Sequence, residues 1–189
     1  HINLLPGTGQ AHRMILEPGK GTFRLHFDST SVPLISVLKA MEVPDNKIKA
    51  ALGDLYSANT KIDNPQNITK LIAKVVKRPD PKKTPSQQLT EALGMMRLDP
   101  EVSRRSLGAP YENVSPDFYM AAAKRVLDVN KGGEQDDRDA LYNQLVMGPE
   151  DLIAERLRNA RGDLHKLLFK ATLKKSVDHI PSGHLTPRV

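Results

Sequence analysis

Residues 13–27, RMILEPGKGTFRLHF, contain two short strand-like runs joined by the turn sequence PGKG. In the second run Phe23, Leu25 and Phe27 alternate with polar residues. A period of two places these three side chains on the same face of a β-strand, and clustered glycine and proline are typical of turns. Residues 1–30 are therefore predicted to form a small antiparallel sheet.

Helix signals dominate the chain after this sheet. Pro33 and Pro44 are expected to open two short helices over residues 33–56, and a weaker helix is expected around Ile68–Val76. Four later starts place proline at the first helical position, behind a residue suited to cap the helix or turn the chain. These starts are Thr84-Pro85, Asp99-Pro100, Ser115-Pro116 and Gly148-Pro149.

The last of these starts begins the longest predicted helix. Its apolar residues keep helical phase across Gly162, which favours one continuous helix. They are Ile153, Leu157, Ala160, Leu164, Leu168 and Ala171. The fold class is therefore predicted to be α+β and predominantly helical, with a small N-terminal antiparallel sheet and a helical lobe.

One domain is expected over residues 1–176, followed by a loosely ordered tail at 177–189. Within the domain we expect a strand-rich part (1–30), helices with a basic stretch (31–83) and a helical part (84–176).

Composition excludes several classes of protein. The 189 residues include no cysteine, so disulfides and thiolate metal sites are absent. Aromatic residues make up only 4%, which disfavours a surface that stacks many bases. No apolar run approaches the roughly 20 residues of a membrane span. The formal net charge of +6 is unevenly distributed, as in a module that touches a polyanion on one side.

Motifs of common catalytic sites are incomplete. The glycine turns match neither a dinucleotide-binding nor a phosphate-binding loop, and the sequence lacks both HExxH and GxSxG. The six histidines form no close-spaced metal pair. A small hydrolase is therefore disfavoured, and neither a catalytic residue nor a metal ligand is assigned.

An acidic tetrad, DDRD at residues 136–139, has three interpretations. Asp136, Asp137 and Asp139 could form a structural clamp around Arg138 by accepting hydrogen bonds from it and from backbone N–H groups. Clustered carboxylates could instead hold Mg²⁺, although an arginine within the cluster would compete for them. The acids could also be surface residues without a special role.

The tetrad carries the clearest resemblance to a known family. Residues 125–141, RVLDVNKGGEQDDRDAL, resemble the lobe domain of the second-largest (β) subunit of multi-subunit DNA-directed RNA polymerases. There a helix, a glycine-bearing loop and a DDxD or DDRD tetrad lead into a long helix. Three other segments resemble that lobe in the same order, at residues 2–17, 23–55 and 89–107.

The chain departs from that family directly after the tetrad. It continues with Ala140-Leu141-Tyr142-Asn143 where the family has a histidine, Gly-Asn and two basic residues. Contacts made by that basic pair are therefore not carried over. The region between the second helix and the helix that carries Met95-Met96-Arg97 is also short. In this respect the chain resembles a compact, divergent lobe of a phage or plasmid enzyme.

The resemblance implies a module of the DNA cleft wall and fork-loop region, beside DNA and the RNA–DNA hybrid, with other polymerase subunits or domains as partners. It implies a cytoplasmic or nucleoid location, or a phage-infected host cell, and no membrane. The catalytic aspartates and Mg²⁺ of such polymerases lie on the other large subunit, so no cofactor is expected here and the fragment is not expected to be catalytic by itself.

Phosphate contacts are expected from five basic residues: Lys131, Arg138, Arg156, Arg158 and Arg161. Each of these charges could instead be simply solvated. For the whole chain, the alternative is a free-standing helical DNA-binding or adaptor protein.

Overall fold

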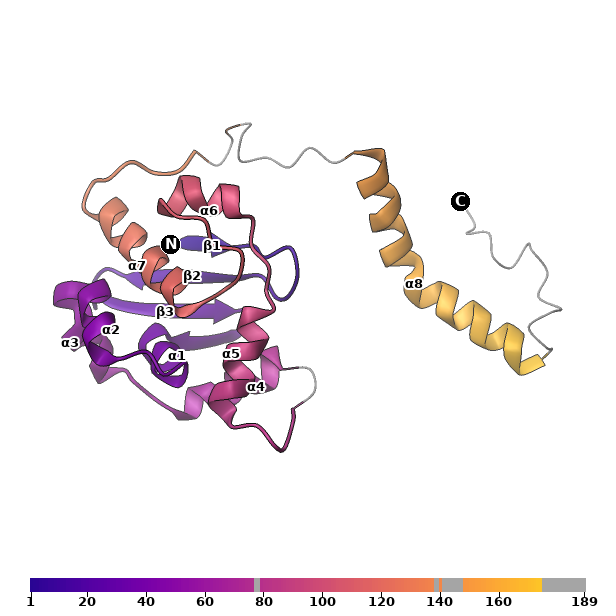
Figure 1. The fold of residues 1–189 in the computed structure, drawn as a ribbon, viewed down its shortest axis with the longest axis horizontal. Coiled ribbons are helices and arrows are strands. Elements are labelled where there is room, and N and C mark those ends of the chain that lie inside the picture. Colours follow the sequence, from indigo (N-terminus) through magenta and orange to yellow (C-terminus); the bar gives the residue numbers. More distant parts are fainter. Residues whose placement is uncertain (77–78, 138–139, 141–147, 175–189) are drawn as a thin grey trace. The chain divides into compact units, whose positions relative to one another are not determined.

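The computed structural model describes residues 1–76, 79–137, 140 and 148–174, with the side chains at 164, 167 and 170–174 excepted. The chain divides into two compact units, residues 1–136 and 137–189. Each unit is described by itself. The first contains the sheet and most of the helices, and the described part of the second consists mainly of one long helix (Figure 1).

The first unit begins with a four-stranded antiparallel sheet whose strands follow one another in sequence order. The strands are β1 (Ile2–Leu4), β2 (His12–Glu17), β3 (Thr22–Phe27) and β4 (Thr30–Pro33). In the central pair Met14 lies opposite Leu25, and Leu16 lies opposite Phe23. All four of these side chains are buried, because directly opposed residues of an antiparallel pair share one face. The predicted sheet is thus confirmed, and it extends three residues beyond 30 to Pro33.

The rest of the described chain, in both units, is mainly helical. They are α1 (Leu34–Ala40), α2 (Asp45–Leu52), the 3₁₀ turn η1 (Gly53–Leu55), α3 (Tyr56–Lys61), α4 (Gln66–Val75), α5 (Pro85–Gly94), α6 (Pro100–Leu107), α7 (Pro116–Asn130) and α8 (Pro149–Lys174). In the first unit the helices gather on one side of the sheet (Figure 1). The α+β, mostly helical class expected from the sequence is confirmed.

Local capping by side chains fixes the predicted starts of α5, α6 and α7. Thr84 forms a complete capping box with Gln87, while the side chains of Asp99 and Ser115 accept hydrogen bonds from the first turns of α6 and α7. Sequence reasoning did not find α3, whose start at Tyr56 has neither a proline nor a side-chain cap.

A single hydrophobic core joins the sheet to the helices. It comprises buried residues from every strand and from α1, α2, α4, α5 and α7, between Leu4 and Val126. A polar pair is embedded in this core, since the Tyr119 hydroxyl on α7 lies 3.0 Å from Nε2 of His12 on β2. The His12 ring also stacks on Phe27, with ring centroids 4.3 Å apart. The pair therefore fixes α7 against the middle of the sheet.

Asn59 on α3 completes the hydrogen bonding of β3 where β4 no longer pairs with it. The β3–β4 register ends with Arg24 opposite Pro33. Beyond that point the Asn59 Oδ1 accepts a hydrogen bond from the Phe23 N–H at 2.8 Å, and its Nδ2 donates to the Gly21 carbonyl at 2.9 Å. A side-chain amide thus replaces the missing strand.

The turn after β1, PGTG at residues 6–9, packs against the segment that follows α5, about 90 residues later in the sequence. The Gly7 N–H donates to the Arg97 carbonyl at 2.8 Å. The Thr8 hydroxyl donates to the Met95 carbonyl and accepts from the Arg97 N–H, both at 3.1 Å. These bonds join the beginning of the sheet to the Met-Met-Arg sequence.

Candidate nucleic-acid interface

The segment after α7 turns sharply on two glycines. Gly132 has a φ of +97°, which favours glycine, and the Gly133 N–H donates to the Asp128 carbonyl at 2.9 Å. A Cβ on Gly133 would lie 2.7 Å from that same carbonyl oxygen. Both glycines are therefore required for the chain to fold back beside the end of α7.

The folded-back chain brings one acid of the tetrad onto α7. The Asp136 Oδ1 accepts a hydrogen bond from Nη2 of Arg125 at 2.6 Å, and the two side chains are 37% and 28% exposed. Because both partners reach solvent, their pairing is worth at most about 1 kcal/mol. The contact fixes the direction of the loop more than it stabilises the fold.

The predicted clamp around Arg138 lies largely outside the described residues, since Arg138 and Asp139 belong to the undescribed positions. Asp137 is described and exposed. Sequence reasoning missed Arg125, the residue that holds Asp136. The two are eleven positions apart, and they meet only through the turn at Gly132 and Gly133.

Lys131 is exposed directly at the end of α7. Its backbone N–H donates to the carbonyls of Leu127 and Asp128 at 3.0 and 3.2 Å. A cation at a helix C-terminus is favoured by the partial negative charge of the last carbonyls. Lys131 thus has a local stabilising role as well as a charge that is accessible to a phosphate.

The three arginines of α8 are all exposed: Arg156, Arg158 and Arg161. At roughly 100° per residue, Arg158 and Arg161 lie about 60° apart around the helix axis, whereas Arg156 lies about 140° from Arg161. Only Arg158 and Arg161 can therefore face one straight phosphate backbone together. By the same geometry, Arg156 projects from another side of the helix.

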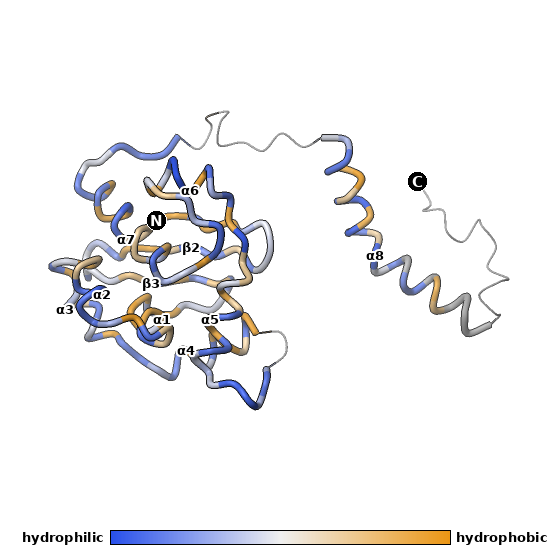
Figure 2. The backbone as a smooth tube through the Cα atoms, viewed as in Figure 1, coloured by the Kyte–Doolittle hydropathy of each residue, from blue (hydrophilic) through white to orange (hydrophobic). Residues whose placement is uncertain are grey.

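α8 also exposes apolar side chains. The exposed fractions range from 41% to 61% for Leu152, Ile153, Leu157, Leu168 and Phe169. Apolar and polar residues alternate along the helix (Figure 2). The helix is continuous through Gly162, as the phase of the apolar residues predicted.

A shallow depression is lined by Leu152, Glu155, Arg156, Asn159 and Ala160, which all belong to this one helix, so it does not enclose a ligand.

The candidate residues fall into two separate groups. Lys131 and Asp136 belong to the first unit, and Arg156, Arg158 and Arg161 to the second. Among the described residues no three histidine or acidic side chains converge as a metal site. The described helices include none with the length and apolarity needed to cross a bilayer.

Comparison with known proteins identified neither a matching family model nor a similar curated protein.

Proposed function

We propose that this chain is a lobe module of a β-type subunit of a DNA-directed RNA polymerase, forming part of the DNA cleft wall and fork-loop region during transcription. One observation carries the proposal. A helix (α7), a Gly-Gly turn, an acidic segment and a long helix (α8) follow one another in the order that the resemblance implies. This order of elements supports the proposal.

Packing within the first unit adds support. The resembling segments at residues 2–17 and 89–107 are held together by the hydrogen bonds of Gly7 and Thr8 to the Met-Met-Arg sequence. Segments so far apart in the chain thus belong to one structural unit, as parts of a single lobe would.

In this function the basic residues contact phosphates rather than bases. Lys131 beside the turn and the pair Arg158 and Arg161 on α8 are exposed and suited to that contact. The catalytic aspartates and Mg²⁺ belong to the other large subunit by the same resemblance. The module then positions DNA and the RNA–DNA hybrid, and the reaction occurs elsewhere in the enzyme.

The test is purification of the tagged chain from cells that express it naturally, followed by an assay of template-dependent RNA synthesis. We expect the chain to co-purify with a polymerase that incorporates nucleotides. In that complex, Arg158→Gln with Arg161→Gln should lower the salt concentration at which elongation complexes dissociate. Lys47→Gln with Lys49→Gln on α2 removes the same charge and should leave that salt concentration unchanged.

A chain that purifies without any RNA-synthesising partner, and binds one DNA sequence tightly by itself, would contradict the polymerase assignment. That outcome would favour the free-standing DNA-binding or adaptor protein.

A further inference from the structure

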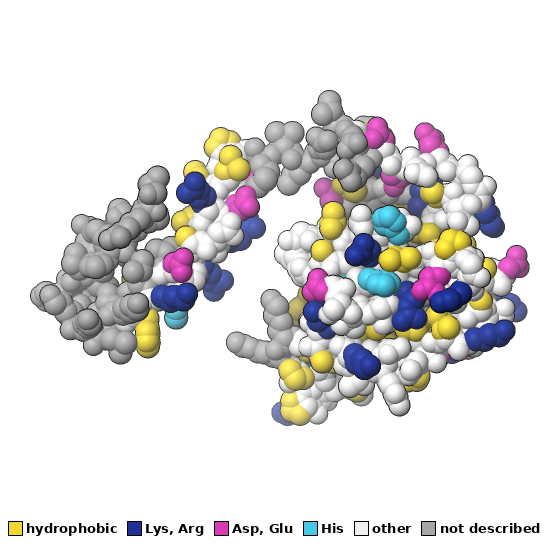
Figure 3. Space-filling view, turned by 180° about the vertical axis from the view of Figure 1, so that it is seen from behind, with side chains coloured by type: hydrophobic (Ala, Val, Ile, Leu, Met, Phe, Trp, Pro, Cys, Tyr) yellow, Lys and Arg dark blue, Asp and Glu magenta, His cyan; other side chains and the backbone are white. Residues whose placement is uncertain are grey.

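The sheet of the first unit has one face that its helices do not cover. Helices α1, α3 and α7 pack on the face that carries Met14, Leu25 and Phe27. The opposite face carries Asn3, Arg13, Ile15, Arg24, His26 and Ser31, and at its end also the opposed pair Glu17 and Thr22, as the strand register requires. We refer to these eight residues as the open sheet face. Figure 3 views the molecule from this side, where histidine and basic side chains lie near the centre of the first unit, with acidic and hydrophobic side chains among them.

A row of polar side chains crosses all four strands of this face. Asn3 lies opposite Arg13, Arg13 opposite His26, and His26 opposite Ser31. With neighbouring strands about 4.8 Å apart, this row is about 14 Å long. Arg24 lies beside the row on β3, two residues from His26. The face thus places two guanidinium groups and several further hydrogen-bonding groups within one small area.

Neither arginine forms a salt bridge among the described residues, although Arg24 interacts electrostatically with Glu17 on the same face. Glu17, the nearest acid along β2, is engaged by Lys20 at 3.3 Å and by the Thr22 hydroxyl at 3.2 Å. Arg24 is instead oriented by Ser31, with Nε donating to its hydroxyl at 2.8 Å and Nη2 to its carbonyl at 3.4 Å. Its remaining N–H groups are available to a ligand.

The positive charges reinforce one another on this face. Burial, and then the nearby charges of Arg24 and Arg13, lower the pKa of His26. A neutral His26 remains a hydrogen-bonding group, and its Nε2 lies 3.3 Å from the Ser31 hydroxyl. An anion bound here would pair with both guanidinium groups, and the nearby Glu17 carboxylate would oppose it.

The chemistry favours phosphates of a duplex over a single strand. Single-strand binding surfaces stack bases on aromatic side chains, but Phe23 and Phe27 of β3 point into the core. Arginine, by contrast, presents a planar fork that matches phosphate oxygens. We propose that the open sheet face binds the sugar–phosphate backbone of duplex DNA through Arg13 and Arg24, which are different residues from those proposed above in the loop after α7 and on α8.

This inference does not rest on the polymerase assignment, because it concerns residues of the first unit only. The test is a fluorescence-anisotropy titration of the full chain with a 20-base-pair duplex at several salt concentrations. Arg13→Gln with Arg24→Gln should weaken binding by about two orders of magnitude at 50 mM salt. It should also reduce the slope of log K against log salt by about 1.8, since each lost phosphate contact contributes about 0.9.

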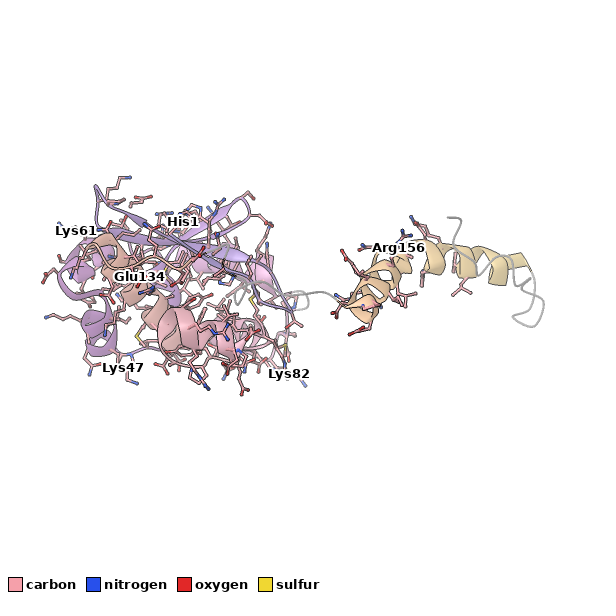
Figure 4. All side chains as sticks on the ribbon, turned by 90° about the horizontal axis from the view of Figure 1, so that it is seen from above. His1, Lys47, Lys61, Lys82, Glu134 and Arg156 are labelled. Carbon is pink, nitrogen blue, oxygen red and sulfur yellow. The ribbon has the colours of Figure 1, made fainter. Side chains whose placement is uncertain are left out.

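The matched control is Lys47→Gln with Lys49→Gln, which also removes two positive charges. Lys47 lies on the helical side of the unit, away from the strands (Figure 4). This control should leave the slope unchanged. Arg13→Gln alone, at an exposed position, should give half the change in slope, so the proposal stays testable even if the loss of the Arg24–Ser31 contacts perturbs the sheet.

Equal binding by the Arg13/Arg24 double variant and the control would overturn the proposal. So would an acidic peptide of matched charge that displaces the duplex and loses its own binding in the double variant, because the occupant would then be a protein segment. Loss of binding only in the Arg158/Arg161 variant would refute the open sheet face while leaving the proposed function intact. Loss of binding only in the Arg13/Arg24 variant would support the open sheet face and contradict the phosphate contacts proposed for Arg158 and Arg161.

Discussion

Two buried polar residues, His12 and Asn59, connect the sheet to the helices that cover it. Each replaces an apolar contact by directed hydrogen bonds, so each fixes one orientation of a helix against a strand. A buried polar group that loses its partner costs more than the bond itself contributes, because the group left behind is neither solvated nor paired. These two positions are therefore sensitive points of the first unit.

His12 should make stability depend on pH. Its Nδ1 lies 3.0 Å from the Gln10 carbonyl, which can only accept, so Nδ1 carries the proton and Nε2 accepts from Tyr119. Burial lowers the pKa of His12 from 6.5 to about 4. The unfolded chain takes up the proton first as the pH falls, so this stabilisation is complete above about pH 6.5 and is lost towards pH 4, by on the order of 2–3 kcal/mol.

Urea unfolding of the wild type and of His12→Gln at pH 7.5 and 4.5 measures this contribution. The variant should be less stable at pH 7.5 but should lose less stability on acidification. An identical loss in both proteins would show that His12 does not titrate as described.

Asn59→Ala should destabilise the first unit by about 3 kcal/mol, because it leaves the buried Phe23 N–H unpaired and removes donors to Gly21 and Leu55. The neighbouring change Thr60→Ala removes one exposed hydrogen bond to Tyr56 and should cost less than about 0.5 kcal/mol. Chemical denaturation of both variants compares the two costs. Similar midpoints for them would be inconsistent with an anchoring role for Asn59.

At the scale of elements, a helix could be predicted from the sequence where its start is marked by residues close to it in the chain. The starts of α5, α6 and α7 could be predicted because Thr84, Asp99 and Ser115 cap within three residues. α3 has no such signal, since it continues directly from a 3₁₀ turn. The role of Asn59 was not predictable either, because it depends on where β4 stops pairing.

The candidate interface follows the same rule. The exposure of Lys131 and the spread of the α8 arginines follow from helical periodicity, and both could be inferred from the sequence. The pairing of Arg125 with Asp136 could not, because the loop must first reverse at Gly132 and Gly133. The open sheet face required the register of all four strands.

The PGTG turn offers a test at this scale. Gly9 has a φ of +103°, and a Cβ there would lie 2.6 Å from Cγ of the buried Met96. Gly9→Ala should therefore cost about 1–3 kcal/mol, from backbone strain together with displacement of Met96. Gly19→Ala is the control, because a Cβ at Gly19 meets nothing within 4 Å, and its effect should stay within about 0.5 kcal/mol.

Thermal unfolding of the two glycine variants would separate these effects. If Gly9→Ala melted at the same temperature as Gly19→Ala, the turn would not be held against Met96 as the structure has it.

At the scale of the whole chain, stability resides in the first unit. The buried hydrophobic residues of the described chain lie between Leu4 and Val126, whereas the apolar side chains described on α8 are largely exposed. A chain of residues 1–136 should therefore unfold cooperatively, with a free energy within about 1 kcal/mol of the full chain. A peptide of residues 148–174 should be only partly helical by circular dichroism, since isolated helices gain little without packing. Non-cooperative melting of the 1–136 fragment would refute this division.

The way the sheet ends at β4 also affects the tendency of the protein to self-associate. Exposed strand edges act as templates on which other chains can add a strand and begin to aggregate. Here the last strand is only four residues long and stops at Pro33, which has no N–H to offer, and Asn59 occupies the stretch of β3 beyond it. The Asn59 amide that anchors α3 thus occupies backbone groups of β3 on which another chain could otherwise add a strand. Loss of Asn59 would therefore favour self-association as well as unfolding.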